Sequence, residues 1–181
     1  AATSTTDYVN EAMEGALHVD SLGDSRDYMG VQVSTGHDAV GKAFSSYTFW
    51  TWADQSPDGE IGLKIITPPA SGTGLGTVRG TSVTTHEANT ATGTQPNDGS
   101  GTSMTFVAPV DTNDPTGYVT LADGDVICLW DKDNAFVSGV GQIQPVMGND
   151  TVSYQEKISF DSDNTRNLLG WHVPSSQRSF K

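Results

Sequence analysis

Three groups of residues in this sequence are candidates for binding phosphate or metal ions: a glycine-rich stretch, two acidic runs and four histidines. Residues 72–77 (GTGLGT) have the small residues of a phosphate-binding loop. They lack the third glycine of a dinucleotide site and the Lys-Ser/Thr pair of a P-loop, so we interpret them as a mobile turn. Residues 131–134 (DKDN) and 161–164 (DSDN) begin like calcium-binding loops. Phe136 and Arg166 stand where such a loop needs glycine, which leaves an irregular surface cation site as the alternative.

The remaining polar residues give no pattern of nucleophile, base or metal ligand. The four histidines lie far apart, without metal-ligand spacing: His18, His37, His86 and His172. The G-x-S-x-G pattern of a nucleophile elbow is absent. The lone cysteine, Cys128, lies in an apolar run and is expected to be a small buried hydrophobe. We therefore predict no catalytic residue, no cofactor and no metal site, and we predict that the protein is not an enzyme.

The aromatic residues of the stretch 44–52 are the first candidates for a binding surface. In an extended strand, Trp50 and Trp52 would share one face and Phe49 would lie on the other. Two tryptophans on an exposed face can stack on sugars. Tryptophan is also enriched in cores and at subunit interfaces. We predict that Trp50 and Trp52 lie in the core or at a subunit interface, with a sugar platform as the alternative.

A second apolar group lies in residues 165–181, which we expect to form a C-terminal arm. Its members are Leu168, Leu169, Trp171 and Val173. Four such side chains would be costly to leave in water, because burying a large apolar side chain contributes about 1.5–3 kcal/mol. We expect them to pack on this domain's own sheet or on a neighbouring subunit, and the sequence does not choose between the two.

Strands must position these residues, because apolar side chains recur at every second position in most of the chain. Clear cases are Met29-Val31-Val33, Ile61-Leu63-Ile65 and Met104-Phe106. Gly, Asn and Asp mark the turns between about ten such stretches. We predict one all-β domain over residues 1–181, an antiparallel two-sheet sandwich built as a single jelly roll of about eight strands. Residues 1–15 would be an N-terminal arm or short helix, and residues 84–102 a long exposed loop.

The charge restricts the partners. Nine Lys and Arg oppose 22 Asp and Glu, which gives a net charge of −13 spread along the chain. Such a surface is a poor partner for nucleic acid and for anionic lipid, although hydrated cations are expected on it. Repulsion among the carboxylates weakens in molar salt, where the Debye length falls to about 3 Å. The charge indicates a halophilic protein, and an ordinary acidic extracellular protein is the alternative. The sequence contains no transmembrane segment, and Asn149 begins a glycosylation sequon.

An acidic chain of strands with no catalytic motif and no cysteine framework resembles the small major capsid protein of internal-membrane-containing haloarchaeal icosahedral viruses. The resemblance covers the whole chain in length, charge and strand count, and it includes no diagnostic motif. It implies a single vertical jelly roll that assembles with a larger partner into pseudo-hexameric capsomers of the virion.

Three classes of function are therefore considered. A structural capsid protein that assembles with copies of itself or a larger partner comes first. An extracellular carbohydrate-binding, adhesive or decoration module on a β-sandwich comes second, and a hydrolase or other enzyme third. Assembly in molar salt separates the first class from the others.

Overall fold

The protein is built almost entirely from antiparallel strands. The computed structural model describes residues 26–33, 36–55, 58–71, 73–91, 101–133, 141–145, 155–162 and 168–172. The predicted N-terminal arm or helix, the sequon at Asn149 and Val173 lie outside these residues. Within them, no helix is long and apolar enough to cross a membrane.

Two sheets contain all the named strands. Within each sheet, every pair of neighbouring strands is antiparallel. The larger sheet has the order β12-β11-β1-β9-β3-β4-β7-β8, and β5 also pairs with β3. Its strands are β1 (Arg26–Val33), β3 (Glu60–Thr67), β4 (Thr77–Thr81), β5 (His86–Glu87), β7 (Val110–Asp111), β8 (Asp114–Tyr118), β9 (Val126–Asp131), β11 (Gln155–Ser162) and β12 (Leu168–His172). The smaller sheet has the order β10-β2-β6, with strands β2 (Ser46–Gln55), β6 (Thr102–Val107) and β10 (Gly141–Pro145).

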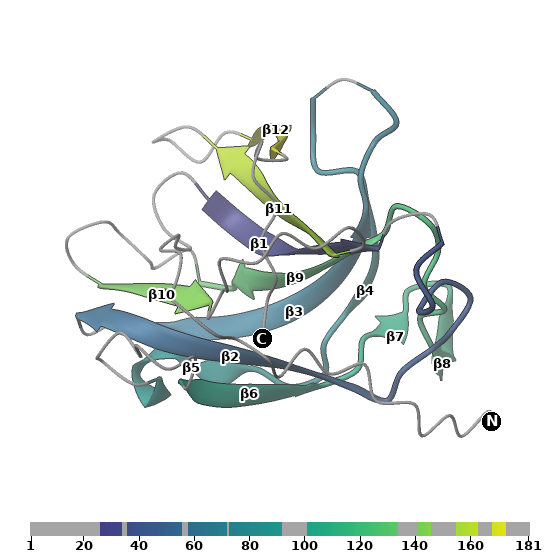
Figure 1. Cartoon of the computed structure of the whole chain (residues 1–181). Coiled ribbons are helices and arrows are strands. Elements are labelled where there is room, and N and C mark those ends of the chain that lie inside the picture. The colour runs from purple at the N-terminus through teal and green to yellow at the C-terminus, as the bar shows by residue number, and fades with distance from the viewer. Residues whose placement is uncertain are drawn as a thin grey trace.

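The smaller sheet lies over one face of the larger one, as Figure 1 shows for β2, β6 and β10 against β3 and β9. This arrangement confirms the all-β, antiparallel two-sheet prediction. The described residues form twelve named strands instead of about eight, because several are short segments such as β5 and β7, which have two residues each. The jelly-roll connectivity stays a prediction.

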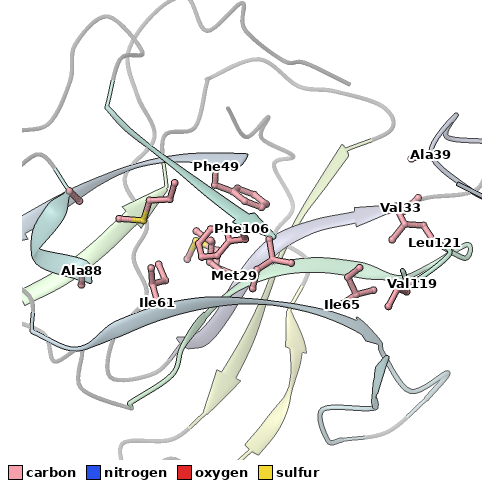
Figure 2. Close-up of a cluster of buried hydrophobic side chains, with 14 of the residues drawn as sticks. Met29, Val33, Ala39, Phe49, Ile61, Ile65, Ala88, Phe106, Val119 and Leu121 are labelled. Atoms are coloured by element: carbon pink, nitrogen blue, oxygen red, sulfur yellow. The ribbon is translucent and has the colours of Figure 1, made fainter. Parts of the chain in front are cut away.

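One core fills the space between the sheets (Figure 2). Strand β6 alternates between this core and solvent. Met104 and Phe106 are buried, and Ser103, Thr105 and Val107 are exposed. The side chains that meet in this core come from both sheets: Met29, Val33, Phe49, Ala53, Ile61, Leu63, Ile65, Met104, Phe106 and Leu129. The alternation predicted for residues 29–33, 61–65 and 104–106 is therefore confirmed.

The other face of the larger sheet carries a second apolar cluster. Leu129 belongs to the core between the sheets, whereas its neighbour Cys128 belongs to this second cluster. The buried members are Tyr28, Ile66, Val126 and Cys128, with Leu75, Val78 and Trp130 packed against them. Strand β9 is thus buried on both faces, which explains its nearly continuous apolar sequence.

Two segments differ from their sequence-based expectations. Residues 84–91, expected to start a long exposed loop, contain β5 and a 3-10 turn, η1 (Ala88–Thr90). Ala88 is fully buried in the core, and its N–H donates to the Gly59 carbonyl at 2.9 Å. Small alanines and threonine hydroxyls anchor this segment, so no large apolar residue marks it in the sequence. In the predicted C-terminal arm, Leu168–His172 forms the edge strand β12, paired with β11.

Candidate functional site

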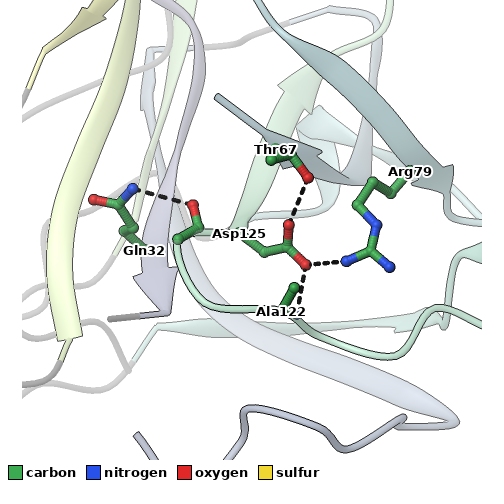
Figure 3. A network of polar contacts seen from close by, with 6 residues as sticks. Gln32, Thr67, Arg79, Ala122 and Asp125 are labelled. Carbon is green, nitrogen blue, oxygen red and sulfur yellow. Dashed lines mark hydrogen bonds and ion pairs between the residues drawn. The ribbon is translucent and has the colours of Figure 1, made fainter. Parts of the chain in front are cut away.

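The best-connected polar group is the carboxylate of Asp125, which is fully buried in the turn that leads into β9 (Figure 3). Its Oδ1 accepts a hydrogen bond from Thr67 Oγ1 of β3 at 2.7 Å. Its Oδ2 accepts from the Ala122 N–H at 2.8 Å and forms an ion pair with Arg79 of β4. A buried charge needs such partners, because an unpaired carboxylate away from water is strongly unfavourable.

The backbone of the same turn is bonded to β1. The Val33 N–H donates to the Asp125 carbonyl at 2.8 Å, and the Gly124 N–H donates to the Val33 carbonyl at 2.7 Å. Gln32 Nε2 adds a bond to the Gly124 carbonyl at 3.1 Å. Gly124 has φ of 84°, a left-handed conformation that glycine adopts without steric cost. The Asp125 turn therefore ties β1, β3 and β4 together at one end of the larger sheet.

Tyr47 is affected by the same carboxylate. Burial raises the pKa of Tyr47 above its usual range, and the negative charge of Asp125 raises it further. The phenol therefore stays protonated. Its ring packs against the core and makes an edge contact with Phe44, with centroids 5.7 Å apart. This environment suits a packed core residue and opposes a role as a base.

A lysine stacked on an aromatic ring marks the outer face of the larger sheet. Lys64 Nζ lies 3.6 Å from the centroid of the Trp130 ring and 5.6 Å from that of Tyr28. Gly62 leaves room for the ring, since a Cβ there would lie 3.0 Å from Trp130 Cε3. Burial lowers the pKa of Lys64. Cation–π contact compensates part of that desolvation.

Cys128 lies fully buried beside Lys64, as expected for a small hydrophobe. Its Sγ donates to the Lys64 carbonyl at 3.4 Å. Burial raises the pKa of the Cys128 thiol far above its usual range. The thiolate required for nucleophilic attack is therefore disfavoured in the folded protein.

Folded protein should consequently resist alkylation at Cys128. Iodoacetamide at about pH 8 should modify the thiol in denaturant and leave it unmodified in the native state, because only unfolding exposes the sulfur and restores its ordinary pKa near 8.5. Mass spectrometry measures the adduct, and the denatured sample is the control. Equal modification rates in both states would contradict the buried placement.

Glu60, at the start of β3, forms an ion pair with Lys132 near the surface. Glu60 accepts from Lys132 Nζ and, at 2.6 Å, from Thr85 Oγ1. Hydrogen bonding from Lys132 lowers the pKa of Glu60. Asp133, in the first acidic run, accepts from the Glu60 N–H at 2.9 Å. Among the described residues, no three His, Cys, Asp or Glu side chains converge as metal ligands.

The two described histidines whose side chains are placed each make a local contact. The Ala39 N–H donates to His37 Nδ1 at 3.0 Å, and burial lowers the pKa of His37. His86 Nε2 lies 2.8 Å from the Thr105 carbonyl oxygen, and its ring makes an edge contact with Phe106. His86 therefore links β5 of the larger sheet to β6 of the smaller one.

The structure places the predicted interface residues in two separate strands. Phe49 faces the core from β2, while Trp50 is half-buried and Trp52 is only 7% exposed. The burial of Trp52 favours packing within the fold over a sugar platform. Leu168, Leu169 and Trp171 lie in β12, at the edge of the other sheet. The tryptophan pair of β2 and the described residues of β12 therefore belong to different sheets.

Among the described residues, large apolar side chains are exposed at four positions that the sequence did not indicate. We refer to these positions together as the end surface: Val40, Val83, Val107 and Tyr118, which are 37%, 67%, 42% and 48% exposed. Hydrogen bonds connect the segments that carry them. The Val107 N–H donates to Thr84 Oγ1 at 2.9 Å, the Ala108 N–H donates to the Ser45 carbonyl at 3.0 Å, and residues 41–43 bond or pair with residues 120 and 121.

Comparisons with models of protein families, with curated proteins and with solved structures find no match to this chain. Evidence for function therefore comes from the chain itself. The polar groups described above brace the sandwich, and among the described residues the end surface is exposed.

Proposed function

We propose that this chain is a structural capsid subunit, which assembles with copies of itself or with a larger partner into the icosahedral shell of a virion adapted to high salt. The observation that carries the proposal is the end surface. Isolated apolar side chains are common on protein surfaces, but several together are typical of interaction sites. Four on hydrogen-bonded segments of a strongly acidic protein suit contacts with neighbouring subunits.

The braced sandwich supports the same proposal. A shell subunit must transmit contact forces without changing shape, and capsid proteins commonly use two-sheet β-sandwiches. Here the core joins both sheets, the Asp125 turn ties three strands of the larger sheet, and His86 links the two sheets. The sugar platform considered for Trp50 and Trp52 would need both rings accessible, whereas Trp52 is buried.

Assembly in molar salt tests the proposal. The purified chain, alone and mixed with any co-purifying larger partner, should form rings or regular lattices in about 2 M KCl, where charge repulsion is screened. Size exclusion with light scattering and negative-stain electron microscopy measure this. A chain that remains monomeric at all concentrations and binds defined sugars on a glycan array would contradict the capsid proposal and favour the extracellular module.

Folding stability should also rise with salt. With a net charge of −13 on one domain, moving from about 0.1 M to about 2 M KCl shortens the Debye length and removes most of the repulsion among surface carboxylates. We expect the melting temperature to increase by several degrees, measured by circular dichroism. A protein of near-zero net charge in the same two buffers is the control for effects of KCl other than screening. An unchanged melting temperature would contradict the adaptation to high salt but not the fold.

A further inference from the structure

Asp-Gly pairs occur in the sequence at residues 58–59, 98–99 and 123–124. In such a pair, the amide nitrogen of the glycine can attack the side chain of the aspartate before it, because glycine has no Cβ to hinder the approach. The structure describes the first and the third pair, whereas the second lies outside the described residues. The two described pairs can therefore be compared directly.

These two pairs have similar surroundings. Asp58 and Asp123 are both exposed, and Gly59 and Gly124 are both half-buried. Both glycines have a left-handed φ, which is 103° at Gly59 and 84° at Gly124. Exposure and glycine conformation therefore do not distinguish the two pairs.

The pairs differ in the acceptor that the glycine N–H reaches. The Gly59 N–H donates to Asp58 Oδ1 at 3.0 Å, so the carboxyl group already lies beside the nitrogen that would attack it. The Gly124 N–H donates instead to the Val33 carbonyl of β1 at 2.7 Å. Attack on Asp123 would break that bond between strand and turn, whereas attack on Asp58 starts from a contact that is already made.

We propose that Asp58 is a site of spontaneous backbone isomerisation in the folded protein, and that the fold suppresses the same reaction at Asp123. The Gly59 nitrogen loses its proton and bonds to Asp58 Cγ, and the protonated carboxyl group releases one water as a succinimide ring closes. One water then opens the ring. Opening at the backbone carbonyl leaves an isoaspartate, in which the main chain runs through the former side chain and the mass is unchanged. This modification is independent of the proposed assembly.

The isoaspartate would lengthen the main chain directly before β3. The Gly59 carbonyl accepts from the Ala88 N–H at 2.9 Å, and the Glu60 N–H donates to Asp133 Oδ2 at 2.9 Å. One additional backbone carbon beside Gly59 would displace these groups from their partners. We therefore expect the Ala88 amide, which anchors residues 84–91, to exchange its hydrogen faster in the isomerised protein.

Ageing of the folded chain tests the site. The chain is incubated for several weeks at mildly acidic pH in molar KCl and digested. Liquid chromatography with electron-transfer fragmentation then distinguishes isoaspartyl from aspartyl peptides. Isoaspartate should accumulate at residue 58 about fivefold faster or more than at residue 123, which is the factor in rate that one retained hydrogen bond provides. In denaturant, where the bond to Val33 is lost, the two sites should isomerise at comparable rates.

Asp58→Glu and Asp123→Glu are matched variants, because glutamate keeps the charge but would have to close a larger ring. Asp58→Glu should remove the isomer at that position and keep the Ala88 amide protected during ageing. Asp123→Glu should leave both the isomer at residue 58 and the faster exchange at Ala88 unchanged. Hydrogen exchange followed by mass spectrometry measures the protection.

Two results would overturn the proposed site. Equal rates at residues 58 and 123 in the folded protein would show that the bond from Gly124 to Val33 does not protect its pair. A rate difference that persists in denaturant would show that local sequence, and not the fold, sets the rates. Isomerisation at residue 58 with unchanged exchange at Ala88 would overturn the expected release of residues 84–91.

Discussion

Replacing Asp125 with alanine should lower the free energy of unfolding by about 3–5 kcal/mol, because breaking a buried ion pair leaves its partner uncompensated. Asp125 is fully buried and bonds Thr67, Arg79 and Ala122. Its removal leaves the guanidinium of Arg79 and the hydroxyl of Thr67 without their acceptor. For a domain of this size, the melting temperature should fall by roughly 6–20 °C.

Chemical denaturation in high salt measures this loss, with Asp123→Ala as the matched control. Asp123 lies in the same turn but is exposed, so its replacement should lower the free energy of unfolding much less than that of the buried Asp125. The double variant Asp125→Ala with Arg79→Ala should cost less than the two single changes added together, because both remove the same ion pair. Additive losses, or equal losses for Asp123 and Asp125, would contradict the bracing role.

The strand pattern was predictable because alternation depends on local chemistry. Met29, Val31 and Val33 point toward the space between the sheets because successive strand residues face opposite ways, and any sheet with one buried face needs that pattern. The all-β class and the two-sheet arrangement followed from such stretches and from the turns between them. Strand β9 was harder to assign from alternation alone, because burial on both faces produces an apolar run that resembles a buried helix segment.

Long-range pairing was not predictable in the same way. In sequence, Asp125 is one of 22 acids, and nothing nearby indicates that Arg79 and Thr67 will reach it from other strands. The anchored segment 84–91 was missed because alanines and threonines hold it, and these residues occur equally in exposed loops. For the Asp125 turn, the Asp123-Gly124 pair was a usable signal, because it indicated a sharp turn immediately before a buried strand.

Candidate surfaces were the least predictable part of the molecule. Trp50 and Trp52 attracted attention through residue type, yet Trp52 is buried in the single chain. Nothing in the sequence singled out the exposed residues Val83, Val107 and Tyr118, because exposure depends on which segments lie beside them.

The core between the sheets provides the other large expected effect. Phe106→Ala should lower the free energy of unfolding by about 3–5 kcal/mol, the usual cost of truncating a buried aromatic residue. Phe106 is fully buried on β6, and its ring meets His86 edge to face with centroids 4.9 Å apart. Truncation would therefore leave a cavity between the sheets and remove the ring against which His86 packs.

The neighbouring residue supplies the control, because Val107 is exposed on the opposite face of the same strand. Val107→Ala should change the free energy of unfolding by less than about 0.5 kcal/mol, while reducing assembly in high salt if the end surface contacts a neighbour. Phe106→Ala should mainly lower the free energy of unfolding, which chemical denaturation measures. Equal stability losses at positions 106 and 107 would contradict the inward and outward assignment of β6, and with it the single core that joins the two sheets.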